Sequence, residues 1–205
     1  MKEFWDSKYA SDEYVYGKNP NKYLKHAISQ NLLSGKIMFP AEGEGRNAVY
    51  AAQQGLNVVA FDQSTEGRIK AMRLAAERGV DIDYIVGEFM KVPIDKEQLF
   101  DAAVLVYAHF PEHLRTAYHR CVAKHIKPGG IIVLEAFSKN HVNNQKQNPA
   151  VGGPGNISML YTKDIIATDF HEFEPIELHE VEINLAEGIG HNGLASVVRF
   201  IGKKR

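Results

Sequence analysis

Residues 39–50 read FPAEGEGRNAVY, a glycine-rich turn between the apolar run KIMF (36–39) and the segment NAVYAAQQG (47–55), which has the pattern of a helix. A strand, a Gly-x-Gly turn and a helix in this order are typical of a nucleotide-binding loop, because glycines let a ligand approach the backbone and a helix start offers free N–H groups. The next apolar run, NVVAFD (57–62), ends on Asp62, whose carboxylate can accept both hydroxyl groups of a ribose. These features predict a nucleotide site, and a purely structural turn is the alternative.

Two acidic residues, Glu42 and Glu44, stand beside the glycines and narrow the choice of nucleotide. The pyrophosphate of a dinucleotide binds at such a loop, and like charges 4 Å apart cost about 4 kcal/mol at an effective dielectric constant of 20. S-adenosylmethionine has no phosphate and carries a sulfonium and an ammonium group, which an acidic loop attracts. Arg46 or backbone amides could bind its carboxylate. The alternative is that one or both glutamates point to water.

Further along the chain, apolar runs alternate with helical segments, which predicts a parallel sheet covered on both faces. The expected strands continue with IDYIVG (82–87), DAAVLVY (101–107) and IIVLEA (131–136), the last after a KPGG turn. Helices are expected at 64–79, at about 112–124 and near 162–169. The two final runs, 175–185 and 194–204, are separated by only AEGIGHNG, which is too short for a crossover helix. The sequence therefore predicts an α/β fold, a Rossmann-like seven-stranded, mostly parallel sheet with helices on both faces and a C-terminal antiparallel hairpin.

Composition limits the kind of protein. The 205 residues suit a single domain, and we expect an N-terminal helical lid over residues 1–34 and a Rossmann-like core over 35–205. A net charge of −1 without a basic stripe argues against nucleic acid as partner. No apolar run is long enough to span a membrane, and the first ten residues lack the apolar centre of a signal peptide, so a cytoplasmic location is expected. The single cysteine, Cys121, is expected in the core and excludes an internal disulfide.

Several stretches together resemble class I S-adenosylmethionine-dependent methyltransferases, and more narrowly the small enzymes of the tellurite-resistance and thiopurine type. They include FWDSKY (4–9), AEGEGRNAVYAAQQG (41–55), VVAFDQS (58–64), LVYAHFP (105–111), GGPGNISMLY (152–161) and EGIGHNG (187–193). The family commonly has Asp-x-Gly-x-Gly-x-Gly at the first strand, whereas this chain has Ala41 in place of the first glycine and lacks the strand's acid. Glu42 could supply that charge from a different position.

The resemblance implies S-adenosylmethionine as cofactor and assigns roles by position. Gly43 and Gly45 would lie under the methionine part, Asp62 would bind the ribose, and Glu88 and Phe89 would meet the adenine. The full set of expected cofactor-binding residues is Trp5, Glu42, Gly43, Glu44, Gly45, Arg46, Asn47, Asp62, Gln63, Ser64, Glu88, Phe89, Tyr107 and Ala108.

The expected catalytic residues are His109 at the end of the fourth strand, His191 near the hairpin turn and Tyr16 in the N-terminal segment. A histidine could serve as general base, whereas a thiolate, selenide or telluride acceptor needs none. Tyr14 and Tyr16 could form an aromatic lid over the sulfonium or simply pack. Glu187 lies in the hairpin loop, near the mouth of the site in the family.

The resulting hypothesis is methyl transfer to a small molecule, with a thiol or reduced chalcogen favoured as acceptor, by a monomer or homodimer without a metal. Two alternatives remain open at this point. One is a nicotinamide-dependent oxidoreductase, which shares the glycine pattern and Asp62 but conflicts with the acidic loop and the closing hairpin. The other is a non-catalytic domain that only binds S-adenosylmethionine.

Overall fold

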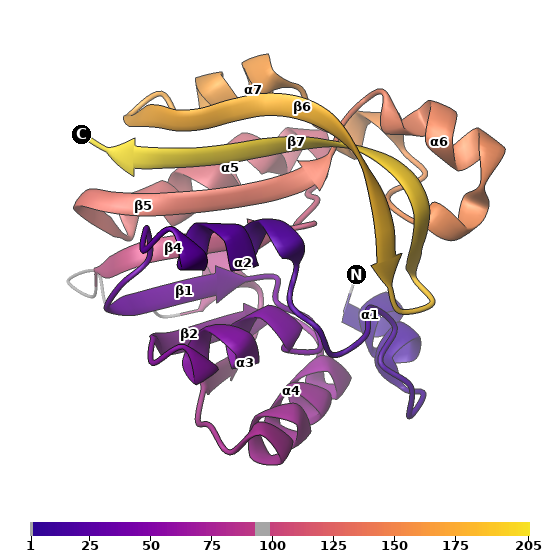
Figure 1. Ribbon diagram of the computed structural model, residues 1–205, viewed down its shortest axis with the longest axis horizontal. Helices are drawn as coiled ribbons and strands as arrows, with labels where there is room; N and C mark the ends of the chain where they lie inside the picture. The colour runs from indigo at the N-terminus through magenta and orange to yellow at the C-terminus, as the bar shows by residue number, and fades with distance from the viewer. Residues whose placement is uncertain (1, 93–98) are drawn as a thin grey trace.

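A seven-stranded sheet in the order β3-β2-β1-β4-β5-β7-β6 forms the centre of the computed structural model, which describes residues 2–92 and 99–205 (Figure 1). The strands are β1 (Lys36–Pro40), β2 (Asn57–Asp62), β3 (Asp83–Val86), β4 (Phe100–Val106), β5 (Ile126–Phe137), β6 (Phe173–Glu187) and β7 (His191–Lys204). The first five run parallel, and β7 pairs antiparallel with both β5 and β6. The predicted sheet and its antiparallel end are confirmed.

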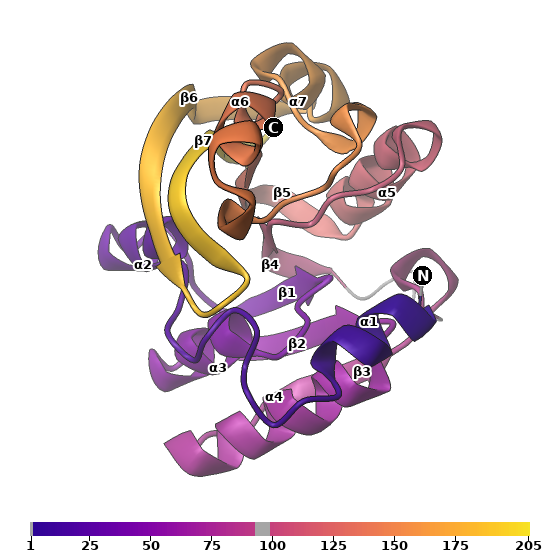
Figure 2. The same cartoon turned by 90° about the vertical axis from the view of Figure 1, so that its right-hand side faces the viewer.

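Helices cover both faces of the sheet, as predicted. The α-helices are α1 (Lys2–Tyr9), α2 (Lys22–Ser29), α3 (Arg46–Gln53), α4 (Thr65–Arg78), α5 (Glu112–Lys124), α6 (His141–Gln147) and α7 (Lys163–Asp169). Short 3-10 turns are η1 (Phe89–Lys91), η2 (Pro149–Val151) and η3 (Ile157–Met159). Figures 1 and 2 show α2, α3 and α4 on one face and α5 and α7 on the other, with α1 and α6 beyond the carboxyl ends of the parallel strands.

The core consists of two layers separated by the sheet. On β1, Ile37 and Phe39 point into the layer under α2, α3 and α4, while Met38 points into the layer under α5 and α7. All three side chains are fully buried. This burial on both faces explains why the strand reads as a continuous apolar run instead of an alternating one.

The C-terminal half differs from the sequence expectation in three places. The hairpin strands extend to Glu187 and His191, so only residues 188–190 form the turn. The KPGG segment lies inside β5 as an irregularity, since the pairing with β4 jumps from Phe100↔Ile126 to Ala102↔Ile131. The polar stretch 138–156 contains α6, whose stability rests on packing against β7 and is not visible as a regular apolar pattern.

The N-terminal segment has two structural roles. Helix α1 packs on α4, and Asp6 accepts hydrogen bonds from the Ser64 hydroxyl (2.7 Å) and the Thr65 amide (2.9 Å) at the start of that helix. Helix α2, by contrast, buries Leu24 and Ala27 in the core layer on the sheet face. The segment placed over the strand ends is therefore 2–21, shorter than the lid of residues 1–34 predicted from the sequence.

Candidate functional site

A cavity of about 430 Å³ lies at the carboxyl ends of β1, β2 and β4, roofed by α1 and the chain after it. Ligand sites of parallel α/β sheets lie at these ends. The cavity brings together most of the residues expected from the sequence, namely Trp5, Tyr16, Glu42, Arg46, Asn47, Asp62, Gln63, Glu88, Phe89, Tyr107, Ala108, His109 and His191. Gly43, Glu44, Gly45 and Ser64 do not line it.

The glycine loop is shaped by left-handed backbone at Ala41 (φ 58°), Gly43 (φ 65°) and Gly45 (φ 88°). A side chain on Gly45 would place its Cβ 2.5 Å from the Cβ of Ala71, so this glycine permits α3 to pack closely on α4. A Cβ on Gly43 would lie 2.7 Å from the Tyr9 hydroxyl. Both glycines shape the loop and its packing without themselves lining the cavity.

Glu42 closes the N-terminus of α3 with its own side chain. Its Oε1 accepts hydrogen bonds from the amides of Asn47 (2.9 Å) and Ala48 (2.8 Å). Burial raises the pKa of Glu42 to about 7, although those amides and Arg46 oppose the rise. The carboxylate thus occupies the N–H groups that a pyrophosphate would need.

Glu44 corrects the sequence expectation, because it points away from the cavity. It is 3% exposed and pairs with Lys70 Nζ at 2.8 Å. It also accepts the backbone amides of Val15 (3.2 Å) and Tyr16 (3.3 Å), so it holds the segment after α1 against α4. Of the two loop glutamates, only Glu42 contributes charge to the cavity.

Asp62 ends β2 with both carboxylate oxygens engaged by the backbone. Its Oδ2 accepts the Gly43 amide (2.9 Å) and its Oδ1 accepts the Ser64 amide (2.8 Å). Burial raises the pKa of Asp62 above its ordinary value. Ser64, expected beside the ligand, is instead fully buried and caps α4 through the Gly67 amide at 3.0 Å. Its hydroxyl group is therefore used within the fold.

Glu88 and Phe89 lie at the end of the cavity near β3. Glu88 accepts a hydrogen bond from the Tyr118 hydroxyl (3.1 Å) and pairs with Lys91 (2.8 Å). Phe89 packs edge-on against Phe61 with ring centroids 5.2 Å apart. Both residues line the cavity, and their contact with an adenine stays a prediction.

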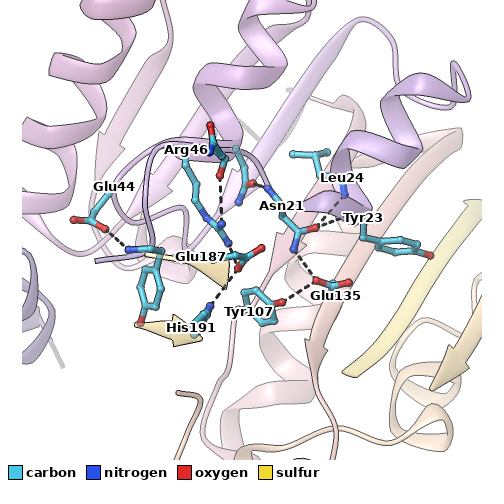
Figure 3. Close-up of polar contacts among 12 residues, drawn as sticks. Asn21, Tyr23, Leu24, Glu44, Arg46, Tyr107, Glu135, Glu187 and His191 are labelled. Carbon is cyan, nitrogen blue, oxygen red and sulfur yellow. Dashed lines mark hydrogen bonds and ion pairs between the residues drawn. The ribbon is translucent and has the colours of Figure 1, made fainter. Parts of the chain in front are cut away.

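The side chain of Arg46 extends from α3 to the β6–β7 hairpin, where its guanidinium group forms hydrogen bonds and an ion pair. Its Nη2 bonds Glu187 Oε2 at 2.8 Å, and Nη1 donates to the Asn19 carbonyl at 3.3 Å (Figure 3). Both side chains of the Arg46–Glu187 pair are about nine-tenths buried, at 7% and 10% exposed. Glu187 Oε2 also lies 3.4 Å from His191 Nδ1. The charge of Arg46 is therefore already balanced by Glu187 within the protein.

His191 is the histidine with a nitrogen open to the cavity. Its ring packs against Tyr16 (centroids 4.4 Å apart), Tyr107 (4.6 Å) and Phe137 (5.1 Å), and its Nε2 has no hydrogen-bond partner within residues 2–92 and 99–205. Burial lowers the pKa of His191, opposed in part by Glu187. The lowered pKa favours the neutral imidazole, and Nδ1 is the ring nitrogen that faces Glu187.

His109 lines the cavity, but its geometry argues against the expected role as a base. Nδ1 donates to the Met159 carbonyl (2.8 Å) and Nε2 accepts the Phe137 amide (3.2 Å). Burial lowers the pKa of His109 to about 3. With both nitrogens bound to backbone and no tendency to take a proton, His109 ties the β4 end to β5 and to the 153–159 segment.

Tyr107 is held in a strained conformation at the end of β4. It has φ 51°, in the left-handed region that non-glycine residues rarely adopt. Its hydroxyl donates to Glu135 Oε1 (2.9 Å), which also accepts a hydrogen bond from Asn21 Nδ2 (2.6 Å) (Figure 3). The other oxygen, Glu135 Oε2, accepts a hydrogen bond from Arg199 Nε (2.7 Å). The buried Glu135 thus fixes the phenol that forms part of the cavity wall.

Sequence reasoning missed several residues that line the cavity. Lys8 and Tyr9 come from α1, Phe137 from β5, and Asn156 and Met159 from the polar stretch. Helical spacing places Lys8 on the face of Trp5 and Phe4, which could have drawn attention to it. Nothing in the sequence around 153–159 marks that segment. Tyr14, by contrast, is buried beneath Lys70 and Arg73, outside the cavity, and is not part of a lid over it.

Residues 40–130 match a family model described as a methyltransferase domain. The chain carries a methyltransferase domain. This match agrees with the methyltransferase expected from the sequence. The nicotinamide-dependent oxidoreductase is thereby set aside, in agreement with the carboxylate that closes the start of α3.

Two known methyltransferases align with the chain. It is 27% identical over 114 residues to ubiquinone biosynthesis O-methyltransferase of Rickettsia conorii, covering 55% of this chain and 38% of that protein. It is 25% identical over 171 residues to thiopurine S-methyltransferase of Vibrio cholerae, covering 74% of this chain and 76% of that protein. The chain therefore spans well under half of the first relative and about three quarters of the second.

Solved structures share the fold of the methyltransferase. One, determined in work on conversion of a disulfide bond into a thioacetal group during echinomycin biosynthesis, has a TM-score of 0.80 at 16% identity and covers 100% of this chain and 92% of that one. TehB from Haemophilus influenzae has a TM-score of 0.70 at 13% identity and covers 100% of this chain and 67% of that one. At these identities the likeness concerns the fold.

Residues 2–92 and 99–205 contain neither a cluster of metal-binding side chains nor a helix that could span a membrane. No group of three or more His, Cys, Asp or Glu side chains there lies close enough together to hold a metal ion. None of the helices in these residues has the length and apolar character needed to cross a bilayer.

Proposed function

We propose that the protein transfers the methyl group of S-adenosylmethionine to a small molecule with a soft nucleophile, a thiol or a reduced chalcogen. Among the relatives, the thiopurine S-methyltransferase acts on sulfur by its name, and the echinomycin structure comes from a study of sulfur chemistry. The ubiquinone biosynthesis enzyme is an O-methyltransferase, so oxygen is the competing acceptor atom. The choice between them depends on the chemistry of the cavity.

The proposed cofactor position follows the ends of β3, β2 and β1. Asp62 would accept the ribose hydroxyls, since its carboxylate is half-buried at the cavity wall. Glu88 and Phe89 would meet the adenine, and Glu42 the ammonium group. Because Glu42 is already anchored by two amides through Oε1, its Oε2 can face a ligand cation without losing those bonds.

The observation that carries the soft-nucleophile proposal is the state of the two cavity histidines. His109 has both ring nitrogens bound to backbone groups and a pKa lowered to about 3 by burial. His191 has a free Nε2, but burial lowers its pKa as well. A weak base of this kind can take a proton from a thiol or selenol, whereas an aliphatic alcohol is far too weak an acid for it.

The cofactor supplies an activated methyl group on a sulfonium, so the protein's task is alignment and exclusion of water. The aromatic rings of Tyr16, Tyr107 and Phe137 surround His191 and keep that part of the cavity apolar. If the acceptor arrives as a thiol, its proton passes to His191 Nε2, and Glu187 at 3.4 Å from Nδ1 stabilises the resulting imidazolium. If it arrives as a thiolate, no proton moves.

Cavity size supports a small acceptor. About 430 Å³ is in the lower part of the range of small-molecule sites, and the cofactor takes most of it. Polymer substrates would need an open groove, whereas this cavity is covered by α1 and the chain after it, with His191 at the start of β7 in its wall.

The proposal is tested by mass spectrometry of reactions with isotope-labelled S-adenosylmethionine and a panel of thiols, chalcogen oxyanions with reductant, amines, alcohols and carboxylic acids. We expect label in thiols or reduced chalcogens at rates well above all other classes. Preferential labelling of an oxygen or nitrogen acceptor would overturn the soft-nucleophile assignment and leave the methyltransferase assignment in place.

A further inference from the structure

Lys8 brings an ammonium group to the cavity. It lies in the last turn of α1, half-buried, with Nζ 5.2 Å from the ring centroid of Trp5 and 5.1 Å from that of Tyr16. Throughout residues 2–92 and 99–205, no carboxylate lies within ion-pair distance of it. Tyr16, one of the two tyrosines that the sequence suggested as a lid over the sulfonium, is thus already in contact with a cation of the protein itself.

Every other charged side chain of the cavity wall has a partner. Arg46 is bound by Glu187 at 2.8 Å, and Glu88 is paired with Lys91 at 2.8 Å. Glu42 and Asp62 accept backbone amides. Lys8 is therefore the cavity cation, within the described residues, whose charge a ligand can balance.

The position of Lys8 is on the hairpin side of the cavity. The Tyr16 ring under its ammonium packs on His191, with centroids 4.4 Å apart. His191 in turn contacts Tyr107 and Phe137. The cation, the phenol and the free imidazole nitrogen thus belong to one contiguous group of side chains. A second positive charge is not attracted to this group, whereas an anion is.

We propose that Lys8 binds the methyl acceptor as an anion and makes ionised, soft nucleophiles the preferred substrates. The inference rests on the proposed function and names the residue that would select the acceptor. In the proposed step the S–H bond of the thiol breaks, its proton goes to His191 Nε2 or to water, and the sulfur keeps the electron pair beside Lys8. That pair then forms the new carbon–sulfur bond as the bond between the methyl carbon and the sulfonium breaks, which leaves a neutral thioether.

Charges from each surrounding element act on a thiol bound there. Lys8 favours the thiolate, as does His191 once its Nε2 has taken the proton of the thiol, and Glu42 and Asp62 on the cofactor side oppose it. Glu187 is neutralised by Arg46. On α1 itself, Asp6 is occupied by Lys2 and by the start of α4. An opposite charge within about 4–6 Å lowers an acid's pKa by about 1–3 units. Removal of the Lys8 charge should therefore raise the pKa of the bound thiol by at least about one unit.

The experiment measures the ionisation of a bound aryl thiol by its thiolate absorbance in the dead-end complex with S-adenosylhomocysteine. The variants are Lys8→Met and Lys8→Gln, which remove the charge, and Lys8→Arg, which keeps it. Lys22→Met is the matched control, because it removes the same charge from the exposed face of α2. We expect the bound thiol to titrate at least about one unit higher in both neutral variants than in the wild type, Lys8→Arg and Lys22→Met. The KM for thiols should rise at least about fivefold in the neutral variants.

The other possible anion is the carboxylate of the cofactor, and binding measurements separate the two. Calorimetry compares S-adenosylhomocysteine with methylthioadenosine, which lacks the carboxylate. If Lys8 serves the acceptor, both affinities stay within about twofold of the wild type in Lys8→Met. A selective loss of S-adenosylhomocysteine affinity with an unchanged titration of the bound thiol would overturn the proposal. Failure of the wild type to methylate any thiol would instead refute the proposed function.

Discussion

Glu42 has two tasks that set different demands on its charge. In the free protein its Oε1 caps α3 through the amides of Asn47 and Ala48, a task that a neutral carbonyl oxygen can also perform. In the proposed complex its negative charge meets the cofactor ammonium. Burial raises the pKa of Glu42 from the ordinary 4.5 to about 7. At a pH between these two values, the folded ligand-free protein keeps a proton on Glu42 that the unfolded chain releases. Between pH 4.5 and 7 the folded state binds more protons, and the free energy of unfolding contributed by Glu42 falls as pH rises.

We therefore expect Glu42→Gln to stabilise the ligand-free protein at pH 8 by about 1–2 kcal/mol and to change its stability little at pH 5. The same substitution should weaken S-adenosylhomocysteine binding at least about tenfold, since a charge-assisted contact is lost. Urea unfolding at both pH values and calorimetry would measure the two effects.

Glu44→Gln is the contrasting control for that experiment. It leaves Lys70 buried without its partner and should destabilise the protein by about 3 kcal/mol. A loss of stability at pH 8 in Glu42→Gln would contradict the raised pKa, because it would mean that the ionised carboxylate stabilises the fold.

His191 allows a sharp test of acceptor chemistry. His191→Ala should lower the methylation rate at least about tenfold while S-adenosylhomocysteine affinity stays nearly unchanged, because the ring belongs to the acceptor side of the cavity. His113→Ala, on the exposed face of α5, should leave both unchanged. The rate with a thiol should rise with the ionisation of the bound thiol in the wild type and in His191→Ala alike. If the substitution abolishes a pH limb near neutrality, His191 acts as an obligatory base instead.

At the level of elements, one buried carboxylate connects four parts of the fold. Glu135 on β5 is hydrogen-bonded to Arg199 on β7. It also bonds Tyr107 at the end of β4 and Asn21, whose own oxygen caps α2 through the amides of Tyr23 (2.9 Å) and Leu24 (3.1 Å) (Figure 3). The antiparallel β7 thus places an arginine where it compensates an acid in the interior of the sheet. The strained Tyr107 is stabilised through the same group.

Glu135→Gln should lower the free energy of unfolding by about 2–4 kcal/mol. Arg199 would lose its charge partner, and the amide hydrogens of the new glutamine would point at the hydrogen-bond donors that now bind Glu135. Denaturant unfolding would measure this loss. Glu180→Gln, at an exposed site on β6 beside Asn140, should change stability by less than about 0.5 kcal/mol. A loss below about 1 kcal/mol at Glu135 would show that the network is dispensable.

The contacts of Glu135 also show which features of the structure cannot be predicted from the sequence alone. The strands, the glycine loop and Asp62 could be predicted, because each depends on a local pattern of apolar residues or glycines. The partners of Glu135 and Glu44 lie 114 and 26 positions away, at Asn21 and Lys70, and no local pattern reveals such pairs. For the same reason Glu44 was expected in the cavity. The contribution of residues 153–159 depends on the turn beyond α6, which has no periodic signal.

At the scale of the whole molecule, segments near the two ends of the chain meet over the cavity. The Gly190 amide at the hairpin tip donates to the Val15 carbonyl at 2.8 Å, and a Cβ on Gly188 would lie 2.4 Å from that same oxygen. This contact joins the segment after α1 to the β6–β7 turn, side by side in Figure 2. A ligand that fills the cavity contacts both and should stabilise them together.

We accordingly expect S-adenosylhomocysteine at 100 times its dissociation constant to add about 2.7 kcal/mol to the free energy of unfolding, which raises Tm by several degrees. Trypsin cleavage after Lys8 and Lys18 should slow in parallel. NAD at the same concentration should do neither. An equal Tm increase with NAD would contradict the assigned cofactor, and a Tm increase without protection would show that the N-terminal segment does not respond to the ligand.

The outermost strand has a consequence for behaviour at high concentration. β6 is 15 residues long and borders the sheet on one side, and among the described residues it pairs only with β7. A long unpaired edge can template the addition of another strand and so promote aggregation. Along this edge Glu174, Glu177, Glu180 and Glu182 recur, with Pro175 near the start of the strand. A second copy that added its own β6 would bring these carboxylates together, and the missing amide hydrogen of Pro175 would interrupt the new ladder. The glutamates of β6 thereby protect the folded chain from fibril-like growth through its longest exposed edge.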